Sequence, residues 1–116
     1  MMRIHYAGGS ELTGTAIADA LLVLAEQLAR AGSATTVDIP VRQEDGSVGR
    51  SRFLIGPASQ IVAETEPTES VELRDEELVL DLVRQANELR PHRVGATESS
   101  DVIDWDLDTD IRPTSL

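Results

Sequence analysis

The sequence predicts an α+β fold, a two-layer β-α-β-β-β sandwich in which one long helix covers an antiparallel meander. Two observations lead to this prediction. Apolar residues recur at helical spacing between Thr13 and Ala31, and short stretches on either side of that segment alternate apolar with polar residues. A second helix and an acidic C-terminal strand or tail follow. At 116 residues, the chain is long enough for one hydrophobic core.

The predicted long helix has two apolar sides. Its main face consists of Ile17, Leu21, Leu24 and Leu28. Thr13 or Thr15 is expected to cap its start, and Gly32 is expected to end it. Leu22 and Val23, together with several alanines, lie beside the main face. This second side also needs a cover, which the second helix or a second copy of the chain would supply.

Four strands are expected around this helix, at about 1–7, 35–42, 48–55 and 59–65. The first is expected to lie parallel to its neighbour through a right-handed crossover, with residues 8–10 turning into the helix. Pro40 indicates an edge strand or a bulge.

The register of the later strands follows from matching their apolar faces, because opposed residues of an antiparallel pair point the same way. A three-residue loop containing a left-handed Gly46 satisfies this condition for the first two of them. A similar loop joins the next pair and completes the meander. The expected pairs are Val37 with Phe53, Ile39 with Ser51, Asp38 with Arg52, Phe53 with Ile61, Ser51 with Ala63 and Arg50 with Glu64.

The chain divides into three segments. Residues 1–65 form the β-α-β-β-β core, and residues 66–90 form a linker and a second helix that packs on the core or on a second subunit. Asp75 is expected to cap that helix. Residues 91–116 form an acidic-hydrophobic tail, in which apolar residues alternate with aspartates as in an added strand or a docking segment.

The net charge of −11 is concentrated in the second half of the chain. Residues 1–63 carry six acidic residues against five arginines, whereas residues 64–116 carry fifteen against five. An acidic field of this kind repels nucleic acids and anionic membranes. The chain contains no cysteine and no lysine, which excludes thiolate chemistry and suggests a GC-rich bacterial genome. No apolar run is long enough to span a bilayer, and the first residues lack a basic segment followed by an apolar one, so we expect a cytoplasmic protein.

Two stretches have the spacing of known sites but lack decisive residues. The segment Gly9–Thr15 has the glycine spacing of a phosphate-binding loop, yet Thr15 stands where the lysine belongs. A helix-capping turn is therefore the preferred interpretation, with a small-ligand or anion site at Gly9, Thr13, Gly14 and Thr15 as the alternative. The aspartates from Asp104 to Asp110 are spaced as in a calcium loop but lack its glycine and its final glutamate.

Neither His5 nor His92 has a partner at a catalytic or metal-binding spacing, so we expect no catalytic residues, no metal and no cofactor. The favoured function is a non-enzymatic interaction or accessory protein that self-associates. The residues expected to carry the interaction are Ile103, Trp105, Leu107, Leu22 and Val23. A chain ending at Thr97 should then lose the oligomer or the partner. The alternatives are a ligand-binding or enzymatic domain at the Gly8–Thr15 turn and an acidic decoy for a basic partner.

Overall fold

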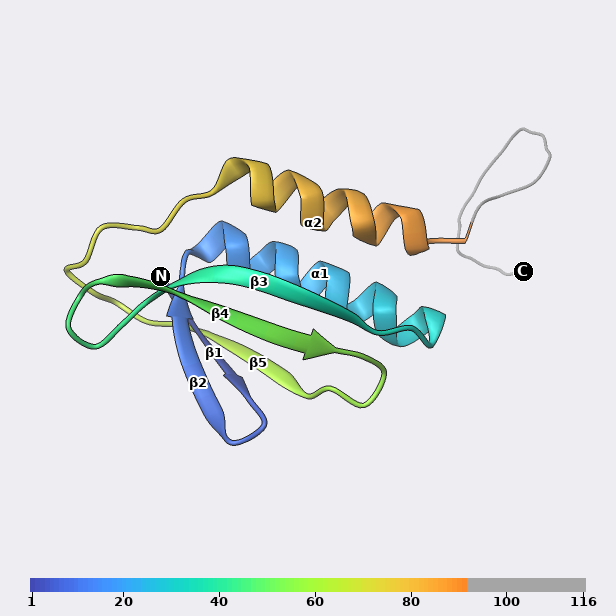
Figure 1. Cartoon of the computed structure of the whole chain (residues 1–116), viewed down its shortest axis with the longest axis horizontal. Helices are drawn as coiled ribbons and strands as arrows, with labels where there is room; N and C mark the ends of the chain where they lie inside the picture. Colours follow the sequence, from blue (N-terminus) through green and yellow to red (C-terminus); the bar gives the residue numbers. More distant parts are fainter. Residues whose placement is uncertain (92–116) are drawn as a thin grey trace.

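The computed structural model describes residues 1–91, and all but the first residue of the predicted tail lies outside this range. The described part is an α+β fold in which a long helix covers an antiparallel sheet, as expected (Figure 1). Its elements are β1 (Met2–Tyr6), β2 (Gly9–Thr13), α1 (Thr15–Ala31), β3 (Thr35–Arg42), β4 (Val48–Ile55), β5 (Ile61–Thr65) and α2 (Glu76–Leu89).

The sheet has the strand order β4-β3-β2-β1-β5, and every neighbouring pair is antiparallel. The register predicted for β3 and β4 is confirmed, with Val37 opposite Phe53 and Asp38 opposite Arg52. Gly46 has the expected left-handed conformation, with φ at 89°. The Gln43 amide donates to the Ser47 carbonyl at 2.8 Å, which closes this hairpin around its turn.

One strand is not predicted by the sequence, in which residues 8–10 are expected to turn directly into a helix that starts near Thr13. These residues form β2, which returns antiparallel along β1, so the expected parallel crossover is wrong. The hairpin turn consists of Ala7 and Gly8, both with positive φ, as in the turns that match the twist of paired strands. Since Leu12 is the only large apolar residue of β2, the strand shows no apolar alternation in the sequence.

The partner expected for β5 is also wrong. It pairs with β1 at the opposite edge of the sheet rather than with β4, and Ile61 lies opposite Tyr6. Consequently Arg50 does not meet Glu64. The Arg50 side chain contacts Asp38 at 2.8 Å, and Glu64 contacts His5 on β1 at the same distance. Both arrangements place the apolar residues of β5 on the inner face, so face matching alone did not distinguish them.

The sheet is folded over at the junction of β2 and β3. Only one residue pair, Leu12 with Arg42, joins these two strands. Beyond it, the Thr13 hydroxyl donates to the Pro40 carbonyl at 2.7 Å in a fully buried position. Pro40 has no backbone N–H. Its nitrogen points toward β2, where the ladder is interrupted, so no acceptor on a neighbouring strand is left without its donor. The fold brings the rings of Tyr6 and Phe53 to a centroid distance of 4.5 Å.

Helix α1 begins two residues later than expected, and its N-cap is Gly14, which makes no side-chain capping bond. The capping acceptor comes from the linker before α2, because the Thr15 N–H donates to the Glu72 carboxylate at 2.5 Å. The same carboxylate pairs with the Met1 ammonium group at 3.0 Å. Gly32 ends the helix in the left-handed conformation, as predicted.

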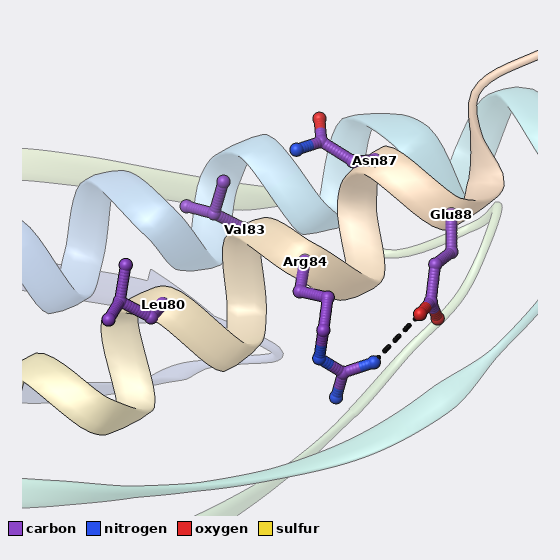
Figure 2. A pocket seen from close by; sticks show the side chains of 5 residues that line it. All are labelled: Leu80, Val83, Arg84, Asn87 and Glu88. Carbon is purple, nitrogen blue, oxygen red and sulfur yellow. Dashed lines mark hydrogen bonds and ion pairs between the residues drawn. The ribbon is translucent and has the colours of Figure 1, made fainter.

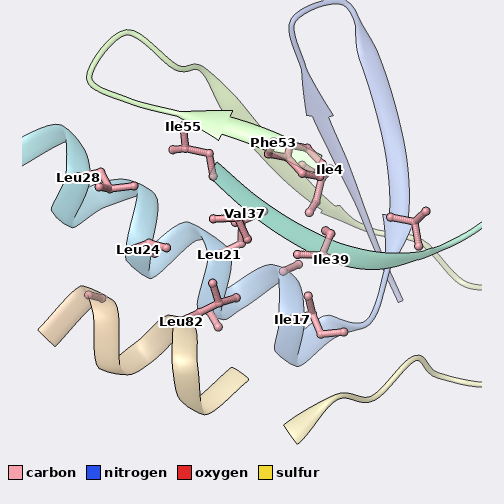
Figure 3. Packing of buried hydrophobic residues seen from close by; sticks show 14 residues of the cluster. Ile4, Ile17, Leu21, Leu24, Leu28, Val37, Ile39, Phe53, Ile55 and Leu82 are labelled. Carbon is pink, nitrogen blue, oxygen red and sulfur yellow. The ribbon is translucent and has the colours of Figure 1, made fainter. Parts of the chain in front are cut away.

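The second side of α1 is covered by α2, so the structure has three layers (Figure 1). Leu82 of α2 points toward α1, whose opposite side faces the sheet (Figure 3). Asp75 caps α2 as predicted, accepting from the Leu78 amide at 3.1 Å. The buried apolar core includes Ile4, Ile17, Leu21, Leu24, Leu28, Val37, Ile39, Phe53, Ile55, Leu82 and Ala86. On the other face of the sheet, the linker after β5 passes close to Arg3 and Arg42, and no described helix covers that face (Figure 1).

Candidate functional site

The most distinctive accessible feature of the described residues is the free edge of β4. This eight-residue strand has a neighbour, β3, on one side only. Gln43 and Ser47 are opposed residues whose backbone groups are hydrogen-bonded. In an antiparallel ladder every second pair is bonded in this way, so the pairs made by residues 48, 50, 52 and 54 of β4 are the non-bonded ones. The amides of Val48, Arg50, Arg52 and Leu54 consequently point away from β3 and are available to another strand.

The side chains beside this edge carry excess positive charge. Arg50 and Arg52 lie on the outer face of β4, with 56% and 74% of their side-chain surface exposed. Both contact the carboxylate of Asp38, at 2.8 and 3.8 Å respectively. Because two guanidinium groups share one carboxylate, the cluster has a net positive charge in a chain that is strongly acidic as a whole.

Other arginines on this face are held by the linker that follows β5. Arg3 binds Glu66 through two nitrogens, at 2.7 and 2.8 Å. This hydrogen bond raises the pKa of Arg3 and lowers the pKa of the Glu66 carboxyl. Arg42 donates to the carbonyls of Gly46 and Val71, at 2.9 and 2.8 Å. The exposed pair on β4 therefore differs from these two, whose guanidinium groups are tied to backbone or to a carboxylate of their own.

An apolar cavity lies at the C-terminal end of the β4 edge. It has a volume of about 250 Å³ and is bounded by β4 and by the residues at the start of β5. Its apolar lining comes mainly from Tyr6, Phe53, Leu54, Ile55 and Ile61. Burial, and secondarily Glu11, raises the pKa of the Tyr6 hydroxyl, so this ring is neutral at physiological pH. The cavity has the size of one large side chain.

The outer surface of α2 is a weaker candidate. Leu80 and Val83 project from the helix beside Asn87, and Leu80 is 70% exposed (Figure 2). The charges there are already paired along the helix, since Arg84 contacts Asp81 and, at 2.8 Å, Glu88. This surface offers no unpaired backbone groups, and its one guanidinium group is shared by two carboxylates.

The structure does not bring together the four residues of the alternative ligand site. Gly9 lies in the hairpin at one end of β2, while Thr13 and Gly14 lie at the other end. The Thr13 hydroxyl is buried against Pro40, and the Thr15 amide is bonded to Glu72. A carboxylate of the chain itself therefore occupies the position at the start of α1 where an anion would bind.

Of the residues expected to carry an interaction, Val23 packs against the hydrophobic core, and Leu22 is half-buried. The sequence correctly indicated that this side of α1 needs a cover, which α2 supplies within the same chain. Ile103, Trp105 and Leu107 lie outside the described residues.

The β4 edge was missed as a candidate site because Arg50 and Arg52 had each been assigned a cross-strand partner. The sequence signal that could have identified it is the pair of arginines at alternate positions of a strand that contains no acidic residue.

Within residues 1–91, no group of three potential metal ligands lies close enough together to hold an ion. Neither helix of that part is long and apolar enough to cross a membrane. Comparisons of the chain with protein-family models, with curated proteins and with solved structures found no match.

Proposed function

We propose that this chain is a small non-enzymatic interaction protein that self-associates, and that the free edge of β4 is its binding surface. The observation that supports this proposal is the row of four outward-pointing backbone amides on an eight-residue edge strand. Long edge strands of this kind accept an added strand, which gains backbone hydrogen bonds along its whole length.

The charge on β4 restricts what such a strand can be. Two copies of β4 paired antiparallel around their middle residues would set Arg50 or Arg52 opposite an arginine of the other copy, which is destabilising. An extended acidic segment has the opposite charge and suits the same face. The binding surface therefore favours an acidic strand over a second β4.

Blocking one outward-pointing amide tests this proposal. Leu54→Pro removes an N–H that faces the free edge, while the bonds between β3 and β4 remain. Leu54→Ala is the matched control, because it shortens the same side chain, which is 75% exposed, and keeps the amide. We expect the proline variant to weaken self-association by at least about fivefold, the equivalent of one hydrogen bond.

Sedimentation or light scattering over a wide range of concentrations measures this effect, and thermal unfolding verifies that both variants fold. A chain that remains monomeric at every concentration would contradict self-association. Equal association by the proline and alanine variants would show that β4 is not the surface used.

A further inference from the structure

We propose that the strand taken up by the β4 edge is residues 101–111 of this chain, and that Trp105 enters the cavity between β4 and β5. This inference rests on the proposed function, since it names the segment that the β4 edge binds. The segment lies outside the described residues, and its sequence is compared with the geometry of β4.

The segment complements β4 on both of its faces. An antiparallel alignment with Trp105 opposite Phe53 places Ile103 opposite Ile55, with all of these side chains on the inner face. The outer face is matched in the same register. The charged pairs on that face are Asp106 with Arg52 and Asp108 with Arg50. A shift by two residues preserves both patterns, whereas a shift by one inverts them.

The cavity supplies a place for the one large aromatic residue of the segment. It lies beside Phe53, where this register puts Trp105, and its volume of about 250 Å³ accommodates an indole ring. The lining consists largely of apolar and aromatic side chains, which favour an aromatic anchor. The nearby Arg52 guanidinium can also stack on the face of a tryptophan ring.

Chain length allows the segment to reach β4. The C-terminal ends of α2 and β4 lie toward the same end of the molecule (Figure 1). Two layer spacings, about 20 Å in total, separate α2 from the sheet. The eleven residues between α2 and the segment, 90–100, extend to about 36 Å. The segment of the same chain therefore reaches the edge, and that of a second copy does so when two molecules meet.

The other free edge of the sheet is a poorer acceptor. Strand β5 is shorter, contains Glu64, and has no basic residue. An acidic segment added there would meet a like charge rather than a guanidinium group. Charge therefore selects β4 among the two edges.

The absence of cysteine makes disulfide mapping a clean test in the full-length chain. The proposed register sets Val48 opposite Asp110, at a separation that a disulfide spans. Under mild oxidation, Val48→Cys combined with Asp110→Cys should bridge about tenfold faster than Val48→Cys combined with Thr109→Cys, whose thiol lies on the opposite face. A third variant, Val62→Cys with Asp110→Cys, reports on the edge of β5.

The second part of the test exchanges the charges of β4 and of the segment. Arg50→Glu with Arg52→Glu should slow the 48–110 bridge by about fivefold. Adding Asp106→Arg with Asp108→Arg to that variant should restore the rate. Equal bridging from positions 109 and 110, faster bridging from Val62→Cys, or no effect of the charge exchange would overturn the proposal and leave an unrelated partner strand as the occupant.

Electrophoresis and light scattering of the same samples separate this inference from the proposed function. A selective bridge within single chains that stay monomeric supports the occupant but contradicts self-association. A selective bridge between chains supports both. Oligomers in which positions 109 and 110 form the disulfide equally fast support self-association and contradict residues 101–111 as the strand bound by β4.

Discussion

The backbone carbonyl of Leu73 lies so close to Gly14 that a Cβ atom at Gly14 would overlap it. Gly14 has an ordinary extended conformation, with φ at −68° and ψ at 151°, so backbone freedom is not the reason for a glycine there. The reason is space, since the linker that leads into α2 passes directly over the start of α1. This contact fixes α2 relative to α1 and to the sheet beneath it.

Gly14→Ala should therefore destabilise the fold strongly. The linker backbone must move to admit the methyl group, which we expect to cost about 2 kcal/mol or more and to lower the melting temperature by about 8 °C or more. Gly9→Ala is the matched control, because a Cβ at that position meets nothing closer than 3.9 Å. Thermal unfolding of both variants measures the difference. Equal melting temperatures would show that the linker does not lie against Gly14.

The accurate predictions from sequence are those set by local pattern. Strands β3 and β4 alternate clearly and flank one turn containing Gly46, so a single register buries their apolar residues together. Helix α2 has a capping aspartate, an apolar stripe and a following proline, and it begins directly after Asp75, the predicted cap.

The errors arose where position depends on contacts that are distant in sequence. Strand β2 has one large apolar residue, Leu12, and this residue lies on the outer face, opposite Arg42. The sequence of β2 therefore shows no alternation of apolar and polar residues. The pair Gly8–Gly9 after a strand does, however, indicate a hairpin. Strand β5 was assigned to its neighbour in sequence, β4, while the structure pairs it with β1, more than fifty residues away along the chain.

The candidate site also depends on contacts that are distant in sequence. The residues of the β4 edge were all predicted to lie in one strand, and their faces were assigned correctly. Which strand forms an edge depends on the order of the whole sheet, and the misplacement of β5 concealed it. The cavity beside Phe53 likewise requires the folding over of the sheet that brings Tyr6 near.

Leu82→Ala should show how strongly α2 contributes to the fold. Leu82 is 1% exposed and belongs to the same buried cluster as the sheet-facing residues of α1. Removing most of its side chain leaves a cavity between the helices, so we expect a loss of about 2–4 kcal/mol in the free energy of unfolding. Leu80→Ala, on the same helix but 70% exposed, should cost less than about 0.5 kcal/mol. Urea unfolding measures the free energy of unfolding of both variants. Similar losses of stability in the two would contradict a close contact between α1 and α2.

Glu72→Gln should lower the free energy of unfolding at neutral pH and change how this free energy depends on pH. The Thr15 amide and the Met1 ammonium group both stabilise the ionised Glu72 carboxylate, which lowers the pKa of this group below its usual 4.5. A lowered pKa in the folded state contributes stability that is present above about pH 4.5 and is lost as the pH falls through the folded-state value. We expect the wild-type chain to be more stable than the variant by about 1 kcal/mol at pH 7.

The difference between the two proteins should then shrink steadily at acid pH, because a protonated Glu72 resembles glutamine in shape and charge. Other carboxyls with lowered pKa values, such as Glu66, are present in both proteins and cancel in the comparison. Urea unfolding of both chains at pH 7 and at several values below 4.5 measures the trend. Glu69→Gln, at an exposed position of the same linker, controls for the loss of one negative charge. A wild-type advantage that persisted unchanged at the lowest pH would mean that the side-chain amide disturbs the packing, and that the charge of Glu72 does not anchor the start of α1.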